Sequence, residues 1–425
     1  LPVGIQYRVL LNTVSSSFVR FNPGGIRQPG SVNHGHATIE INDGAKHFKA
    51  LLSLSESREE NRTRLEECIK PQLELLPSLD PDPHFILNPQ MEKIEHCGPE
   101  SVDKPQDVVR SIVEGAKGLD LVGIYAAGRL SRTYIDSKGS SLHHESERSH
   151  FDFSLYAHHD KAVKCSVSGE QWDKSHFDRC ITGAREQLPY LHKDSRKIAP
   201  GNYRAYLAPS ALRSILSLLS WSSFSEKSHQ TGLSPLKYLR NESRDLHEDV
   251  SIAESPTELQ GPRFNETGFL SPDKTHLIQN GKYASALVSP RSGKEFDINH
   301  NGAAPSESPS YLSMSPGTLA AQEALKLLDT GIYISDLWYL NFSDPQVCRM
   351  TGMTRFASFW VENGQLVAPL SVMRFDDSIY EILGSKLVGL TGETETFHEA
   401  HTYGSRSTSA MQVPGALVDG LTFTL

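Results

Sequence analysis

Histidine is the residue type that first suggests metal chemistry in this chain, because 18 of its 425 residues are histidines. A zinc peptidase helix needs two histidines one turn apart, with a glutamate beside the first as general base. His-Glu dipeptides begin at His144, His247 and His398. The positions four residues after these histidines hold Arg148, Ser251 and Thr402. None of the three dipeptides therefore has the second ligand that such a helix requires.

Two denser groups of histidines are interpreted as structural rather than metal-binding. The first consists of His143, His144 and His150 with nearby glutamates. It lies between two predicted strands, so we expect a solvated hairpin or loop. The second is His398 with His401, where neighbouring glycines and threonines favour a loop or a strand over a helix. We therefore predict no metal site at either group of histidines.

Cysteine is the remaining candidate nucleophile, and the chain has five widely spaced cysteines without a C-x-x-C motif. An odd number at this spacing argues against a disulfide framework and favours a reducing, cytoplasmic location. No G-x-S-x-G, P-loop or G-x-G-x-x-G motif occurs in the sequence. Cys348 follows a predicted turn between two strands. A cysteine hydrolase that uses Cys348 with one of the histidines therefore stays open as an alternative.

Composition limits the class of protein. The formal net charge is −9, the hydrophobic fraction is 38%, and the mean hydropathy is −0.39, an ordinary balance for a soluble globular protein. No run of 18 apolar residues occurs, so no transmembrane helix is expected. The acidic charge argues against broad binding to a phosphate backbone. We expect a protein of two or three domains that acts on neither nucleic acid nor membrane.

The N-terminal half alternates predicted strands with three predicted helices. Ser57 precedes the first helix with Glu60 three residues later, which is the spacing of a capping box. Pro71 should kink or end that helix. The second helix begins near Pro105, and the third spans about Lys174–Leu188. Alternating apolar residues on both sides of a His-His-Asp turn predict a half-buried hairpin before the third helix.

We predict that the C-terminal half consists mainly of β-strands. One helix opens at Pro209, and another is predicted over Gly317–Leu328. Residues 222–267 are polar, so we predict a long loop or mobile excursion there. The predicted fold class is α+β. It comprises an N-terminal α/β domain of strands and three helices over residues 1–200 and a mainly β C-terminal domain over residues 201–425.

One stretch of the C-terminal half is similar to a known family. Residues 355–366 read Arg-Phe-Ala-Ser-Phe-Trp-Val-Glu-Asn-Gly-Gln-Leu. They resemble the strand–turn–strand of the TldD/PmbA family, whose members are called modulators of DNA gyrase and form a bacterial metallopeptidase system. The resemblance is diffuse but collinear across nearly the whole chain, and its most specific block is Phe359–Gly364. Further similar segments are residues 18–32, 134–139, 200–211, 317–334 and 414–424.

The resemblance also indicates a branch of the family. The TldD branch has an H-E-x-x-x-H helix and a downstream Cys that together hold zinc, whereas the PmbA branch, also called TldE, lacks them and pairs with TldD. The family pattern puts the zinc helix at Ser210–Ser222, which contains neither His nor Glu. It puts the cysteine near Thr394–Tyr403, which contains none. The resemblance therefore implies a TldE/PmbA-like chain without a cofactor, with zinc in a TldD-like partner.

The function implied by the resemblance is that of a non-catalytic subunit in a heteromeric metallopeptidase. Such a complex cleaves unfolded peptides or the leader peptides of ribosomally made natural products. The peptide is expected to bind as an extended strand in an enclosed chamber, where backbone pairing gives affinity with little demand on sequence. The candidates for peptide binding or for an interface are Arg355, Phe359, Trp360, Glu362 and Asn363.

Other interpretations of these features remain open. Phe359 and Trp360 are also explained by core packing, and Glu362, Asn363 and Gly364 by a hairpin turn. The polar residues 222–267 would cover a partner, line the chamber or stay disordered on the surface. A different class of function is a standalone peptide-binding or scaffold homodimer without protease activity.

Overall fold

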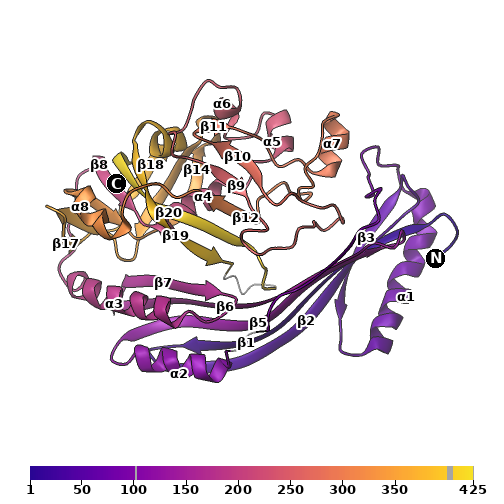
Figure 1. Ribbon diagram of the computed structural model, residues 1–425, viewed down its shortest axis with the longest axis horizontal. Helices are drawn as coiled ribbons and strands as arrows, with labels where there is room; N and C mark the ends of the chain where they lie inside the picture. The colour runs from indigo at the N-terminus through magenta and orange to yellow at the C-terminus, as the bar shows by residue number, and fades with distance from the viewer. Residues whose placement is uncertain (101–102, 400–404, 425) are drawn as a thin grey trace.

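The computed structural model describes residues 1–100, 103–399 and 405–424. It contains a seven-stranded sheet in the N-terminal half and a thirteen-stranded sheet in the C-terminal half. Helices pack on both sheets (Figure 1). The predicted α+β class is confirmed. No helix among the described residues combines the length and apolarity that crossing a membrane requires.

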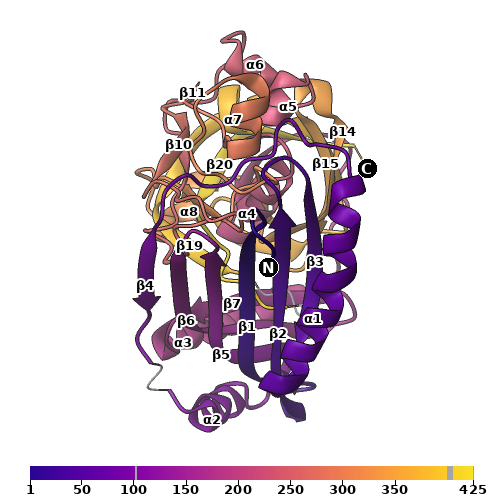
Figure 2. The ribbon, with the colours of Figure 1, turned by 90° about the vertical axis from the view of Figure 1, so that its right-hand side faces the viewer.

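The N-terminal sheet is made of long, mostly antiparallel strands in the order β3-β2-β1-β5-β6-β4, and β7 also pairs with β6. Among the described strands of this sheet, only β4 runs parallel to its neighbour, β6. Figure 2 shows these strands side by side below the C-terminal half. The strands are β1 (Gln6–Phe21), β2 (Ile26–Asn42), β3 (His47–Leu54), β4 (Lys93–Cys97), β5 (Asp120–Asp136), β6 (Ser141–His158) and β7 (Lys161–Gly169).

Strand β6 shows how this sheet separates two environments. Side chains alternate between the two faces of a strand. Phe151 and Phe153 are buried in one cluster with apolar residues of α2 (Pro105–Gly115) and α3 (Lys174–Leu191). Arg148 and His150 point the other way and contact His398 and Arg406 of the C-terminal half. The C-terminal half therefore lies on the face of β6 opposite α2 and α3.

The structure corrects two predictions for this half. The first is the solvated character of His143–His150. These residues lie in β6, which forms a hairpin with β5, but His144 and His150 are only 5% and 2% exposed. Because β4, β5 and β7 all pair with β6, the strand continues through the polar sequence.

The second is the expectation that the helix could end at Pro71. Ser57 caps α1 (Arg58–Leu75) as predicted, but the helix continues past Pro71 to Leu75 before a short 3-10 turn, η1 (Leu76–Ser78). Leu65, Ile69 and Leu73 pack against the apolar cluster of β2. This packing holds the helix across the missing hydrogen bond.

The C-terminal sheet branches around β20 (Ala410–Phe423), which pairs with β8, β12, β18 and β19. The remaining strands are β8 (Gly201–Leu207), β9 (Ile252–Glu254), β10 (Thr275–Gln279), β11 (Lys282–Tyr283), β12 (Tyr311–Met314), β13 (Gly331–Ile334), β14 (Asp336–Asp344), β15 (Arg349–Arg355), β16 (Phe359–Glu362), β17 (Gln365–Pro369), β18 (Arg374–Ser378) and β19 (Leu387–His398). In this branched sheet β14 pairs with β15 alone and β19 with β20 alone, among the strands described.

Helix α4 (Pro209–Leu219) is the central helix of the C-terminal half. Leu212, Ile215, Leu216 and Leu219 are fully buried in the largest apolar cluster of the molecule. The predicted helix Gly317–Leu328 is shorter than expected, because only its last part is helical. The other short elements are α5 (Glu226–Gln230), α6 (Lys237–Arg240), α7 (Pro290–Phe296), α8 (Ala324–Leu328), the 3-10 turns η2 (Ala321–Glu323) and η3 (Pro345–Val347), and the π-helical turn η4 (Glu381–Ser385).

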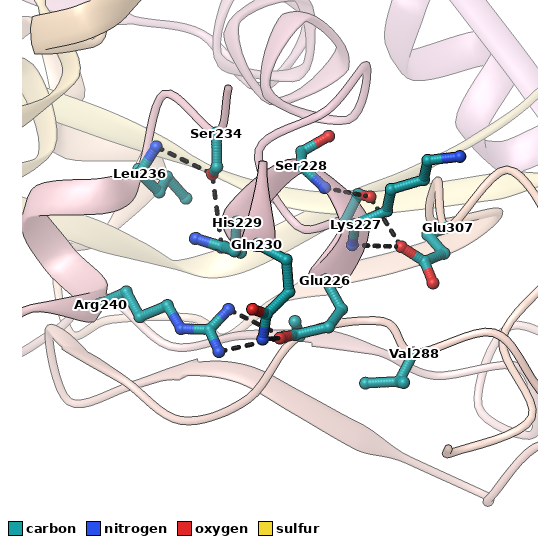
Figure 3. Close-up of polar contacts among 12 residues, drawn as sticks. Glu226, Lys227, Ser228, His229, Gln230, Ser234, Leu236, Arg240, Val288 and Glu307 are labelled. Carbon is teal, nitrogen blue, oxygen red and sulfur yellow. Dashed lines mark hydrogen bonds and ion pairs between the residues drawn. The ribbon is translucent and has the colours of Figure 1, made fainter. Parts of the chain in front are cut away.

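Residues 222–267, predicted as a long loop or mobile excursion, are mostly irregular but also contain α5, α6 and β9. Their polar side chains bond to one another (Figure 3). Glu226 is 3% exposed, and its carboxylate accepts from Arg240 at 2.8 Å and from Gln230 at 2.7 Å. Glu307 accepts from the backbone N–H of Lys227 at 2.8 Å. Composition alone did not reveal this internal pairing, which lets a polar segment fold into the body of the domain.

Candidate functional site: a cavity between the two halves

A cavity of about 770 Å³ lies between the two halves of the molecule. The N-terminal half contributes Asp152 from β6 and Lys164 and Ser166 from β7. The C-terminal half contributes the exposed side of α4, part of β14, and the adjoining ends of β19 and β20. A cavity of this size between domains is a common location for a ligand site.

Helix α4 presents a polar side to the cavity. Arg213, Ser214, Ser217 and Ser220 line it, at spacings that put them on one side of a helix. The hydroxyl of Ser220 donates back to the carbonyl of Leu216 at 2.8 Å. The apolar residues of α4 fill the opposite side, which anchors the helix in the core and fixes the direction of its polar side.

This helix occupies the segment to which the family pattern assigns zinc ligands, and its side chains do not fit zinc. Towards the cavity it offers hydroxyl groups and the guanidinium of Arg213, whereas zinc in proteins is held by thiolate, imidazole or carboxylate. In the parts of the chain that the structure describes, no three His, Cys, Asp or Glu side chains are grouped to hold a metal. We derive no hydrolytic step through a metal for this chain. His401 lies outside the described residues, so its pairing with His398 is untested.

The charged groups of the cavity differ in how well they are compensated. Lys164 and Asp152 form an ion pair at 3.0 Å. Asp336 is 6% exposed, and burial raises the pKa of its carboxyl although Arg213 and Lys164 oppose this shift. Arg213 and Arg355 form no ion pair with any residue of the described ranges. The cavity therefore contains two guanidinium groups that have no carboxylate in direct contact.

Aromatic rings hold these two guanidinium groups in place. The guanidinium carbon of Arg355 lies 4.1 Å from the ring centre of Trp338 and 4.4 Å from that of Phe356. The corresponding distance from Arg213 to the ring of Phe397 is 4.5 Å. Stacking on aromatic faces stabilises a cation while leaving its N–H groups available to a ligand.

Three large aromatic residues remain exposed at the cavity. Trp221, Trp338 and Tyr339 are 62%, 44% and 67% exposed. The register between β14 and β15 shifts between Trp338 and Asn341, and Tyr339 has φ of 53°. A bulge of this kind redirects side chains and is frequent beside binding sites. Clustered exposed aromatic rings are typical of surfaces that bind another molecule.

His398 lies at the edge of the cavity, in β19 rather than in a loop. Its Nδ1 lies 3.0 Å from the Ser168 hydroxyl, and its Nε2 lies 3.2 Å from a guanidinium nitrogen of Arg148. Burial, with neighbouring Arg148, lowers the pKa of His398 to about 3. This histidine is therefore neutral at physiological pH, and both of its ring nitrogens are already engaged within the protein.

The five predicted peptide-binding or interface residues are divided between two places. Arg355 lines the cavity. Phe359 is fully buried, and Trp360 donates from Nε1 to Glu362 at 2.6 Å. Glu362 also pairs with Arg196 at 2.7 Å, and Asn363 occupies the left-handed turn before Gly364. The last four residues thus form a hairpin fastened to the segment that joins the two halves, outside the cavity.

Several cavity residues were not identified from the sequence. Arg213 and Lys164 belong to different halves of the chain, and Trp338 and Tyr339 lie on β14, which packs directly against α4 although the two are far apart in sequence. The adjacent Trp338-Tyr339 pair was the available signal, since exposed aromatic residues often mark binding surfaces.

Cys348, the alternative nucleophile, is fully buried and lies outside the cavity. Burial raises the pKa of its thiol far above the usual value. The reactive form of cysteine is the thiolate. A buried thiol that stays protonated and lies outside this cavity therefore gives no support to a cysteine hydrolase at this position.

Comparisons with known proteins add a family and a fold. The family description "PmbA/TldA metallopeptidase C-terminal domain" matches residues 200–425. TldE from Thermococcus kodakarensis has a similar structure, with a TM-score of 0.80 and 13% identity over 99% of this chain and 97% of its own. A proposed modulator of DNA gyrase from Thermotoga maritima has a TM-score of 0.76 and 15% identity over 99% of this chain and 96% of its own. A proposed modulator of DNA gyrase from Bacteroides thetaiotaomicron has a TM-score of 0.78 and 16% identity over 99% of this chain and 94% of its own. No curated protein matched the sequence.

Proposed function

This chain belongs to the PmbA/TldD family, and from that premise we propose that it is a zinc-free, TldE-like subunit of a heteromeric metallopeptidase. In this proposal the chain has no catalytic residue of its own. It forms one wall of a peptide chamber and helps to hold the peptide, while a TldD-like partner supplies the zinc site and cleaves the bond. The substrates are unfolded peptides or leader peptides of ribosomally made natural products.

The observation that carries the proposal is the side of α4 that lines the cavity. In the segment where the family pattern expects two histidines and a glutamate, this helix offers Arg213 and three serines. A guanidinium repels a divalent cation but attracts carboxylate groups. The cavity is therefore better suited to binding a peptide than to activating water.

The exposed edges near the cavity support binding of an extended chain. Strand β14 pairs with β15 alone among the described strands, and Trp338, Tyr339 and Leu340 of β14 line the cavity. An extended peptide adds to such an edge through backbone hydrogen bonds, and neighbouring side-chain pockets select its residues. Arg213 and Arg355 would bind carboxylate groups of the peptide, and the aromatic rings would cover its apolar side chains.

A cytoplasmic location is part of the proposal. All five cysteines are free thiols in the structure, which is compatible with a reducing compartment. The exposed rings of Trp221, Trp338 and Tyr339 would be covered by the partner once the chamber closes.

Reconstitution with a zinc-bearing TldD-like protein tests this function. The pure chain should contain no stoichiometric zinc and should not cleave an unfolded peptide. After the partner is added, the two should co-elute in size-exclusion chromatography and cleave the peptide in a chelator-sensitive reaction. Chelator-insensitive cleavage by the isolated chain would refute the proposal. Stable self-association with peptide binding, and no effect on the partner, would instead favour a standalone homodimeric binding protein.

A further inference from the structure

Two cysteines that do not line the large cavity share a second, smaller cavity. Cys165 on β7 and Cys180 on α3 line a space of about 210 Å³ next to the large cavity. Each thiol shifts the pKa of the other. Both are half-buried and pack against the same apolar core. The packing of α3 against β7 thus brings two sulfur atoms together.

A histidine completes this cluster. His176 precedes Cys180 by one helical turn on α3 and hydrogen-bonds to its side chain. Hydrogen bonds from Cys165 and His176 lower the pKa of Cys180 to about 5, although burial opposes this. The pKa of Cys165 is raised by the same contact and by burial. At neutral pH the pair therefore consists of a Cys180 thiolate and a Cys165 thiol.

The charged groups around the pair come from several elements. Arg179 on α3 adds positive charge beside Cys180. Glu395 of β19 faces the pair across the cavity, and burial raises the pKa of this carboxyl to about 7. Asp152 of β6 acts on Cys165. Lys164 and Arg213 line the same space.

We propose that Cys180 is a reactive thiolate that reduces a hydroperoxide, with Cys165 as the resolving thiol. The arrangement is that of redox-active cysteines generally, which combine a stabilised thiolate, access through a cavity and a neighbouring second cysteine. The two thiols lie outside the large cavity, although Lys164 and Arg213 line both spaces. Oxidation of the thiols and binding of a peptide are therefore measured independently. The cluster is not a metal site, because no metal-holding group of three ligands occurs within the described ranges.

The chemistry proceeds in two steps. The Cys180 sulfur attacks one oxygen of the hydroperoxide. The O–O bond breaks, a sulfenic acid forms, and the departing alkoxide or hydroxide takes a proton from the His176 imidazolium. The Cys165 thiol then loses its proton and attacks the Cys180 sulfur, so that the S–O bond breaks, a disulfide forms and water leaves. Two thiols are oxidised and the hydroperoxide is reduced to an alcohol, or to water, together with one further water. Thiol–disulfide exchange with a small-molecule thiol restores the pair.

Peptide mapping after peroxide treatment tests this site in the full-length chain. Hydrogen peroxide is added at neutral pH, free thiols are alkylated, and the cysteine peptides are identified by mass spectrometry. The wild type should form a Cys165–Cys180 disulfide that dithiothreitol reverses. Cys165→Ser should accumulate a Cys180 sulfenic acid that dimedone traps, and Cys180→Ser should form neither product. Cys97→Ser, at an exposed cysteine elsewhere, should behave as wild type.

A second measurement keeps the proposal testable if a serine variant folds poorly. In the wild type, iodoacetamide should modify Cys180 at pH 7 about tenfold faster than Cys68, because Cys180 is held as thiolate. His176→Gln should move the pH midpoint of that modification upward, because His176 lowers the pKa of Cys180. Oxidation of Cys97 or Cys68 before Cys180, or peroxide consumption unchanged in Cys180→Ser, would overturn the proposal.

Discussion

Arg355 and Arg213 are the residues on which peptide recognition depends most. Both guanidinium groups lie against aromatic rings in the cavity, and neither contacts a carboxylate within the described chain. A cation partly removed from water gains most from a ligand that brings negative charge and hydrogen-bond acceptors. We therefore expect a preference for peptides with a free terminal carboxylate or an acidic side chain.

Replacement of Arg355 by Gln tests this preference. The variant should bind carboxylate-bearing peptides about tenfold more weakly, because a hydrogen bond to a charged group contributes roughly 1.5–3 kcal/mol. Fluorescence anisotropy with peptides that differ only by amidation of the C-terminus, or by Glu→Gln, identifies which carboxylate is bound. Arg349→Gln is the matched control, since Arg349 lies on the same strand but pairs with Asp376. Equal losses for charged and amidated peptides would contradict this role.

Buried histidines give the protein a specific dependence on pH. Burial and the neighbouring Arg406 lower the pKa of His150 to about 4, below the ordinary value of about 6.5. Between these two pH values the unfolded chain takes up a proton that the folded chain does not. The stabilising contribution of neutral His150 is therefore complete above about pH 6.5 and is lost as the pH falls.

This contribution is measurable by comparing two proteins. Between pH 7 and pH 5, His150 should remove about 2 kcal/mol from the free energy of unfolding. His150→Gln should lack that part of the pH dependence in urea denaturation. The comparison is made between variants because Glu254 and Glu395, whose pKa values burial raises to about 7, act in the opposite direction. An unchanged pH slope in the variant would rule out a buried neutral His150.

At the scale of elements, α5 and α6 show how a polar segment folds. Glu226 of α5 is buried and is neutralised by Arg240 of α6, which is about one-third exposed (Figure 3). Removing one member of such a pair leaves the other uncompensated, whereas removing both is much less costly.

A double-mutant cycle at this pair tests the explanation. Arg240→Met should destabilise the protein by about 2 kcal/mol in urea denaturation, because the Glu226 carboxylate stays buried without its cation. Adding Glu226→Gln should recover most of this loss. If the single and double variants are equally destabilised, the packing of the arginine stem rather than its charge explains the effect.

The sequence was sufficient to predict many elements but few of their contacts. Ser57 capped its helix as expected, and the helix after Pro209 formed, because capping and apolar periodicity are local signals. The helix did not end at Pro71, because the packing of α1 against β2 outweighed the local preference of proline to end a helix. Arg355 was found through its similarity to a family motif. Arg213 and Tyr339 were not identified from the sequence, because the cavity that they line forms only where β7, β14 and β19 come together in the fold.

At the scale of the whole molecule, the two halves create a site that neither has alone. Strand β6 buries Phe151 and Phe153 beneath α2 and α3, and its opposite face turns Asp152 towards the cavity. The other wall is α4, fixed by the core of the C-terminal half. The long N-terminal sheet thus serves as the base on which the second half encloses space (Figures 1 and 2).

The most direct test of the peptide-holding role is to fill this cavity. Ser217 is exposed on the cavity side of α4, so Ser217→Trp adds bulk without disturbing the core. In the reconstituted complex, the variant should still co-elute with the zinc-bearing partner and leave its zinc content unchanged. Peptide cleavage should fall at least about tenfold, since the ring occupies the peptide's place. Ser306→Trp, at an exposed position away from the cavity, should cleave as wild type. Full cleavage by the Ser217→Trp complex would contradict the claim that this cavity holds the peptide.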